Sequence, residues 1–194
     1  MNYNYGFIEL NSGISFSFAN KTDILVYPIG LINTIIYVII SFKYHLLGEA
    51  SVNFYYTVMS IYGWILWTKK DKLNQNKLLH ITFSTKKEWL QQLLFFLIFY
   101  CIIFYLLTIA KENFAAGAIP WADAFASATA YTGMWLMAKK KVESWWWWIA
   151  TNIASIPLYF VKSLVFTSFQ YIVLLVLAIA GLITWMKKVN EKNA

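Results

Sequence analysis

Six apolar runs, separated by short polar segments, are the feature that most limits how this chain can fold. A helix that crosses the hydrocarbon core of a bilayer needs about 20 mainly apolar residues, and each run is close to this length. The sequence is 60% hydrophobic and only 13% charged, whereas about 25% of the residues of a soluble domain are charged. We therefore predict an all-α integral membrane protein. Its expected membrane-spanning helices lie at residues 24–42, 49–67, 89–109, 118–138, 145–161 and 167–186.

The positions of the lysines predict how this bundle is oriented. All 16 basic residues are lysine, and most of them lie in the loop 69–87, in the segment 139–141 and in the C-terminal tail. Basic residues collect on the cytoplasmic side of membrane proteins, so these segments are predicted to be cytoplasmic. No basic stripe follows a helix face, so the net charge of +7 does not indicate nucleic-acid binding.

Two short segments, each at the end of an apolar run, repeat one another. The segment GWILWTKK, which begins at Gly63, aligns without a gap with GLITWMKK, which begins at Gly181. Asn33 precedes the first glycine by 30 residues, and Asn152 precedes the second by 29. Both copies run through the membrane in the same direction, which predicts a parallel repeat related by an axis along the membrane normal.

This repeat predicts a seventh helix. The helix at 118–138 precedes the second copy, so symmetry requires a helix before 24–42, and the segment 5–20 is the candidate. The run 89–109 then serves as a linker helix that inverts the chain. The predicted architecture is seven transmembrane helices in two parallel three-helix repeats, with the N-terminus outside and the C-terminus in the cytoplasm; six helices would put both ends inside. Its units are a first bundle at 1–68, a cytoplasmic loop and linker helix at 69–112, and a second bundle with a short tail at 113–194.

Aromatic and polar side chains share one face of three predicted helices. Trp145, Trp148 and Asn152 are spaced i, i+3, i+7, which is one helical stripe. Asp123, Ser127 and Tyr131 step by four along the run 118–138. In the run 49–67 the members of such a face are Asn53, Tyr56, Ser60, Trp64 and Trp67. Polar groups at membrane depth usually face the bundle interior or a cavity, so these stripes are expected to point inward.

Each stripe also has a purely structural interpretation. Asn152 could hydrogen-bond a neighbouring helix, with tryptophans packed around it. Asp123 lies near the outer end of its helix, where it could be an interfacial carboxylate or a helix cap. Trp146 and Trp147 are expected to belong to an interfacial aromatic belt. Pro157 is expected to kink its helix.

The three stripes together suit a flat small molecule that is polar or cationic. Stacking and cation–π contacts hold such a ring, and Asn and Ser side chains can read hydroxyl or amide groups. Asp123 is the one acid well within a predicted span, so the chain has too few buried charges for an ion-coupled pump.

The same residues carry a resemblance to a known family. The segments IYGWILWTKK at 61–70, WADAF at 121–125 and ESWWWWIATNIASIPLYFVKSL at 143–164 resemble the PnuC family of nicotinamide riboside transporters. That family's pattern Trp-x-x-Trp-x-x-x-Asn is matched by Trp145, Trp148 and Asn152. The likeness covers roughly 24–67 and 121–186.

This resemblance implies a seven-helix, SWEET-like fold in a bacterial inner membrane. It also implies uptake by facilitated diffusion, with the substrate trapped inside the cell by phosphorylation. The chain departs from the family in two ways. Several relatives carry glutamine where Asn53 stands, and their first helix is longer and more apolar. The first departure leaves open thiamine or another aromatic vitamin as the substrate.

Proteins of two other classes compete with a transporter. A membrane-embedded enzyme would need catalytic groups, but His45 and His80 are placed in loops or near helix ends without a paired carboxylate motif, and Cys101 is the single cysteine. No metal site, cofactor or cleavable signal peptide is predicted. A receptor-like protein would not require the duplication and the polar stripes. The expected partners are a small-molecule substrate and the lipid bilayer, and a homo-oligomer is left open.

Overall fold

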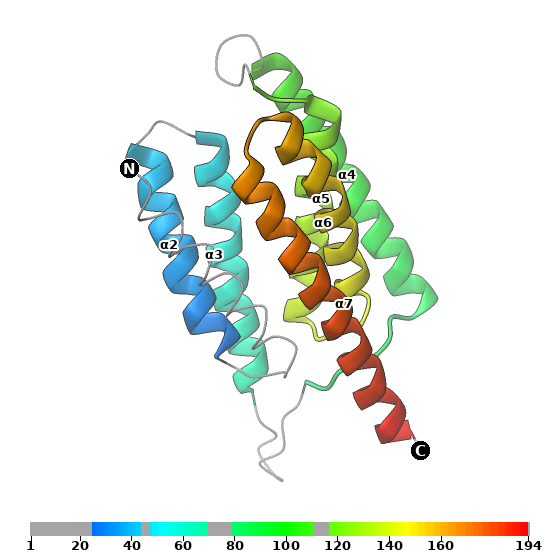
Figure 1. Ribbon diagram of the computed structural model, residues 1–194. Helices are drawn as coiled ribbons and strands as arrows, with labels where there is room; N and C mark the ends of the chain where they lie inside the picture. Colours follow the sequence, from blue (N-terminus) through cyan, green and yellow to red (C-terminus); the bar gives the residue numbers. More distant parts are fainter. Residues whose placement is uncertain (1–24, 44–46, 70–78, 111–116, 194) are drawn as a thin grey trace.

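The computed structural model describes residues 25–43, 47–69, 79–110 and 117–193, and six helices make up most of this part of the chain (Figure 1). The predicted helix at 5–20 lies outside the described residues. The helices are α2 (Val26–Lys43), α3 (Leu47–Thr68), α4 (Lys86–Ala110), α5 (Pro120–Ala138), α6 (Ser144–Val161) and α7 (Val165–Asn193). The prediction of an all-α protein is confirmed.

The six apolar runs correspond to these helices, and the bounds differ by more than two residues at two ends. α4 begins at Lys86 rather than at residue 89, because Thr85 and Glu88 form a reciprocal cap: the Thr85 N–H donates to Glu88 Oε2 at 2.8 Å, and the Glu88 N–H donates to Thr85 Oγ1 at 3.3 Å. α7 continues to Asn193 rather than ending at residue 186. Lysines near a helix C-terminus interact favourably with the helix dipole, so the charged tail extends the helix.

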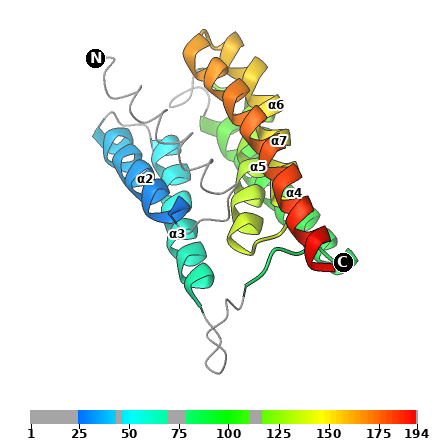
Figure 2. The ribbon, with the colours of Figure 1, turned by 60° about the horizontal axis from the view of Figure 1, so that its bottom comes forward.

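The helices form two groups that meet at α5. α2 packs on α3, while α6 packs on both α5 and α7, and α4 packs on α5. The two groups are joined where α3 packs on α5, and Figures 1 and 2 show α2 and α3 together beside the other four helices. α5 is therefore the central element, and a site between the groups must include it.

Small side chains let α5 and α6 approach closely. Ala124, Ala128 and Gly133 are buried along α5, and small residues at helix interfaces allow close backbone contact in membranes. Between these two helices, the buried hydroxyl of Thr151 donates to Thr129 Oγ1 at 2.9 Å. The sequence thus directs the small face of α5 inward, against α6.

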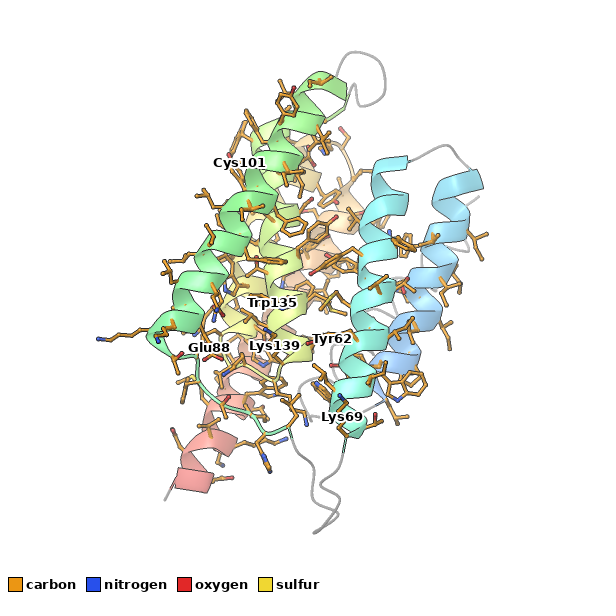
Figure 3. All side chains as sticks on the ribbon, turned by 180° about the vertical axis from the view of Figure 1, so that it is seen from behind. Tyr62, Lys69, Glu88, Cys101, Trp135 and Lys139 are labelled. Carbon is orange, nitrogen blue, oxygen red and sulfur yellow. The ribbon has the colours of Figure 1, made fainter. Side chains whose placement is uncertain are left out.

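Many apolar side chains point away from the bundle, as expected for helices that face lipid. Leu90, Leu97 and Ile109 of α4 are more than half exposed, and Figure 3 shows side chains, Cys101 among them, projecting from this helix. By length and composition, α4 over 86–109 and α7 over 165–191 could each cross a membrane, while 27–39 is a shorter apolar helix. The other described helices contain tyrosine, tryptophan and small polar residues, which lower their hydropathy.

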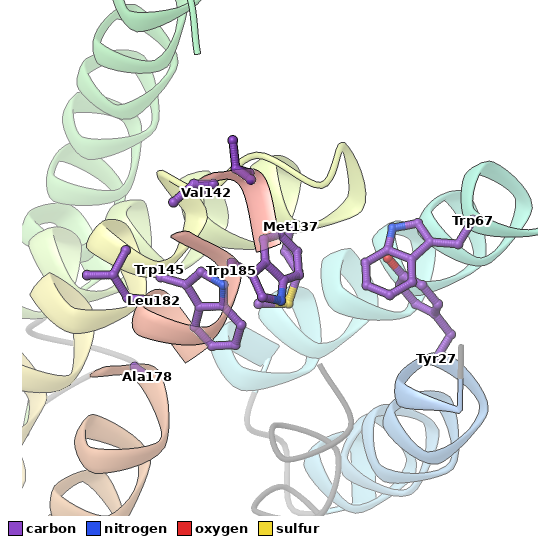
Figure 4. Close-up of a cluster of buried hydrophobic side chains, with 9 residues drawn as sticks. Tyr27, Trp67, Met137, Val142, Trp145, Ala178, Leu182 and Trp185 are labelled. Atoms are coloured by element: carbon purple, nitrogen blue, oxygen red, sulfur yellow. The ribbon is translucent and has the colours of Figure 1, made fainter. Parts of the chain in front are cut away.

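A buried apolar cluster fills the lysine-rich end of the bundle, where α3 and α5 end and α6 begins (Figure 4). Its rings meet edge to face: Tyr27 on Trp67 at 5.0 Å, and Trp145 on Trp185 at 5.4 Å between centroids. Trp67 and Trp185 lie 6.3 Å apart and join the two pairs. Gly63 faces this cluster, and a Cβ atom there would collide with the Tyr27 ring. We call the four rings of Tyr27, Trp67, Trp145 and Trp185 the terminal aromatic cluster.

Candidate functional site

Aromatic rings from three helices gather between α3 and the packed pair of α5 and α6. Tyr55 and Tyr56 come from α3, Tyr131 from α5 and Trp148 from α6; we call these four residues the central aromatic cluster. The Tyr56 ring lies 6.1 Å from Tyr131 and 6.5 Å from Trp148 between centroids. The Tyr55 ring lies 4.3 Å from that of Tyr131, and its hydroxyl donates to the Tyr131 carbonyl oxygen at 3.1 Å. The structure thus brings together Tyr56, Tyr131 and Trp148, which three separate sequence stripes predicted.

Two neighbours set the positions of these rings. Gly133 lies against the Trp148 indole, and a Cβ atom at this glycine would be 3.3 Å from the indole ring. Phe99 of α4 meets the Tyr131 ring edge to face at 5.3 Å. The absence of a side chain at Gly133 therefore lets the indole lie flat against α5, while Phe99 closes the α4 side.

Asn152 is the most unusual polar group near this cluster. It lies one turn after Trp148 on α6 and is 1% exposed. Its Nδ2 atom has no hydrogen-bond partner among the described residues. A buried donor without a partner costs about 1–3 kcal/mol. The position therefore favours a hydrogen-bond acceptor from outside the protein.

Asn53 and Ser127 lie at a similar level to Asn152. Both are half-buried. Asn53 lies three residues before Tyr56 on α3, and Ser127 four residues before Tyr131 on α5. α3 and α5 run toward the lysine-rich end and α6 runs away from it, so each polar residue lies about one turn, or ~5.4 Å, farther from that end than its aromatic partner. We call Asn53, Ser127 and Asn152 the polar layer. It is one turn removed from the central aromatic cluster, so one molecule could contact both.

Three other predicted site residues are not in this region. Trp67 and Trp145 belong to the terminal aromatic cluster and are 3% and 0% exposed. The Trp145 ring packs edge to face on Trp185 of α7, and Trp148 packs against the same buried cluster from the next turn of α6. Trp64 is 40% exposed, so it lies at the outer edge of the α3 face rather than inside the bundle.

Asp123 lies at the end of the bundle opposite the lysines, in the first turn of α5. One carboxylate oxygen pairs with Lys162 Nζ at 2.6 Å, and the other accepts the Ile119 N–H at 2.6 Å. Eight residues of helix, about 12 Å, separate Asp123 from Tyr131. The structure therefore favours the alternative of an interfacial cap over a place beside the aromatic rings.

A hydrogen-bonded network at the lysine-rich end was missed by the sequence patterns. The Trp147 indole N–H donates to Gln92 Oε1 at 3.1 Å, so this ring has a specific partner on α4 in addition to its predicted place in the interfacial belt. Trp146, in contrast, is 53% exposed, as a belt residue should be. Two lysines that were considered only as topology signals also make specific contacts: Lys140 Nζ lies 4.5 Å from the Trp67 ring centroid, and Lys141 pairs with Glu88 at 2.8 Å. The sequence feature that indicates this network is a glutamine, Gln92, within the apolar run 89–109.

The fold and the site define a class: a polytopic helical membrane protein whose interior holds aromatic rings and amide side chains. The particular family follows from sequence comparison, because residues 7–187 match the family described as nicotinamide mononucleotide transporter. The chain belongs to this family. Its membership confirms the predicted family and the prediction of a transporter rather than an enzyme.

Individual relatives agree with this assignment. The nicotinamide riboside transporters PnuC of Escherichia coli (strain K12) and of Shigella flexneri are each 23% identical over 195 residues, which cover 91% of this chain and 82% of theirs. The fold is similar to a crystal structure of the vitamin B3 transporter PnuC, with a TM-score of 0.70 and 21% identity over 95% of this chain and 80% of that one.

Proposed function

We propose that this protein takes up nicotinamide riboside across a bacterial inner membrane by facilitated diffusion, with intracellular phosphorylation trapping the product. The observation that carries the proposal is the buried Asn152 amide one turn from Trp148, a member of the central aromatic cluster. Nicotinamide riboside has a flat cationic ring, a carboxamide and ribose hydroxyls. The ring suits stacking and cation–π contact with Trp148, Tyr56 and Tyr131, and the other groups suit the polar layer.

Charge favours a riboside over the mononucleotide that the family description names. A phosphate is usually held by charge-assisted hydrogen bonds from arginine or lysine. The described members of the central aromatic cluster and of the polar layer are all uncharged. A transported phosphate would thus be desolvated there without a cationic partner, which is costly.

We further propose that two parallel three-helix repeats frame this site, with a helix at 5–20 completing the first. The terminal aromatic cluster supports this arrangement. Trp67 and Trp185 are equivalent in the repeated segments, and each receives an edge-to-face ring from the preceding helix of its own copy, Tyr27 or Trp145. The lysine-rich end would face the cytoplasm, which places the N-terminus outside and the C-terminus inside.

The test of substrate identity is binding to the purified protein. Isothermal titration should show saturable binding of nicotinamide riboside, with nicotinamide mononucleotide at least tenfold weaker. Thiamine, which also has a flat cationic ring, is the competitor that decides between two vitamins. Tighter binding of thiamine would transfer the proposal to thiamine, and binding of neither compound would overturn it.

We predict that transport is driven by the substrate gradient alone. A coupled transporter must bind its ion in a way that depends on substrate occupancy, and Asp123 is held by Lys162 and the Ile119 N–H instead. Proteoliposomes with equal substrate on both sides should show no net uptake when a proton or sodium gradient is imposed, yet they should exchange labelled for unlabelled substrate. Asp123→Asn should retain this exchange. Concentrative uptake that Asp123→Asn abolishes would identify the carboxylate as a coupling site.

A further inference from the structure

Gln92 differs from every neighbour on its helix. α4 is mostly exposed apolar surface, and the adjacent Gln91 is exposed too, but Gln92 is 0% exposed. Its position near the start of α4 brings it to the lysine-rich end, beside the first turn of α6. A fully buried carboxamide on an outward-facing helix must have its polar atoms satisfied, and here both ends of the amide are used.

The amide of Gln92 is the middle of a continuous chain of hydrogen bonds. Its Oε1 accepts the Trp147 indole N–H at 3.1 Å, and its Nε2 donates to Ser84 Oγ at 2.7 Å. The Ser84 hydroxyl donates to Glu143 Oε2, and the Ser84 N–H donates to Glu143 Oε1, each at 2.8 Å. Glu143 immediately precedes α6. This chain of hydrogen bonds therefore begins at Glu143, one residue before α6, and ends at Trp147 in the first turn of α6.

The surrounding backbone holds this chain in place. Thr82 and Lys141 form a parallel β-bridge, in which the Thr82 N–H donates to the Lys140 carbonyl oxygen at 3.2 Å and the Val142 N–H donates to that of Thr82 at 3.1 Å. The segment 79–85 is thus fixed to the turn between α5 and α6 before it enters α4. Gln92 is therefore anchored in a rigid frame that consists of this segment and the turn.

This frame sets how α6 is rotated about its axis. Neighbouring residues of a helix point about 100° apart, so fixing the direction of the Trp147 indole also fixes that of Trp148. The Trp147 ring is held from α4 as well, 5.2 Å from the Phe96 ring between centroids. A rotation of α6 by a few tens of degrees would turn Trp148 away from Tyr56 and Asn152 away from the polar layer.

We propose that Gln92 is a positioning residue of the substrate site: through Trp147 it holds α6 in the rotation at which Trp148 and Asn152 face the substrate. This inference rests on the proposed binding of nicotinamide riboside. Gln92 belongs to the helix that links the two proposed repeats and touches none of the proposed site residues itself. The affinity of the site therefore depends on a helix outside both repeats.

The test compares matched pairs of variants by isothermal titration with nicotinamide riboside and by thermal melting of the substrate-free protein. Gln92→Met keeps the volume and removes both hydrogen bonds, and Trp147→Phe removes only the indole donor and the larger ring. Gln91→Met and Trp146→Phe are the matched controls, since both residues are exposed. Each of the first two variants should raise Kd about fivefold, as expected for one hydrogen bond, and the controls should stay within about twofold. The double variant should bind no more weakly than the weaker-binding single variant, because both single variants remove the same hydrogen bond between Gln92 and Trp147.

Each other outcome has a defined meaning. Unchanged Kd for Gln92→Met and Trp147→Phe, with lowered melting temperatures, would overturn the inference and leave Gln92 a local packing residue. Additive losses in the double variant would also overturn it, since the two residues would then act separately. If Gln92→Met does not fold, Trp147→Phe against Trp146→Phe decides alone. Failure of the unaltered protein to bind nicotinamide riboside would overturn the proposed function itself, and this is seen before any variant is measured.

Discussion

Replacing Trp148 by alanine is expected to weaken nicotinamide riboside binding by about 1–2 kcal/mol, roughly five- to thirtyfold. The indole lies against Gly133 and 6.5 Å from the Tyr56 ring, so it forms one wall of the proposed site. Truncation removes a stacking and cation–π surface for the pyridinium ring. Isothermal titration of the purified variant measures the loss directly.

Trp146→Ala is the control for this variant. The Trp146 side chain comes from the same helix turn as Trp148 and has the same size, but it is 53% exposed on the outer face of α6. Its removal should leave Kd within about twofold. Equal losses at all four tryptophans from Trp145 to Trp148 would contradict a site at Trp148 and favour a plain interfacial belt.

Asn152→Leu should change binding and stability in opposite directions. Leucine shares the branching of asparagine at Cγ but has no polar atoms, so it removes a buried donor that lacks a partner among the described residues. The substrate-free variant should therefore melt at or above the temperature of the unaltered protein. Binding should weaken by about 1–2 kcal/mol, because an acceptor on the substrate loses its hydrogen bond. Thermal melting and titration of the same preparation give both quantities.

Thr151→Val, at the position adjacent to Asn152, is expected to lower stability without weakening binding. Thr151 is also buried, but its hydroxyl is satisfied by Thr129 at 2.9 Å and by the Trp147 carbonyl oxygen at 2.9 Å. This variant should melt at a lower temperature while Kd stays within about twofold. If Asn152→Leu also lowers the melting temperature and leaves Kd unchanged, Asn152 is a structural residue that hydrogen-bonds within the protein.

The sequence alone was enough to predict the six described helices and the family. Apolar runs of bilayer length leave a chain few alternatives to a helical bundle, because backbone polar groups in hydrocarbon must be satisfied within the segment. The Thr85–Glu88 cap and the lysines that extend α7 are equally local signals, and both could have been read from the sequence. Helical spacing also predicted that Tyr56, Tyr131 and Trp148 point into the bundle, since that direction depends only on which face of each helix is polar.

Only the tertiary structure decided which inward-facing side chains meet. Trp145 and Trp148 lie on one stripe, yet Trp185 of α7 takes the first and Tyr56 of α3 lies beside the second. Asp123 shares a predicted stripe with Ser127 and Tyr131, yet its carboxylate pairs with Lys162, 39 residues away in sequence. A helical period fixes the direction of a side chain from its own axis. Its partner depends on the tilt, depth and neighbours of that helix, and these are set by packing between segments far apart in the chain.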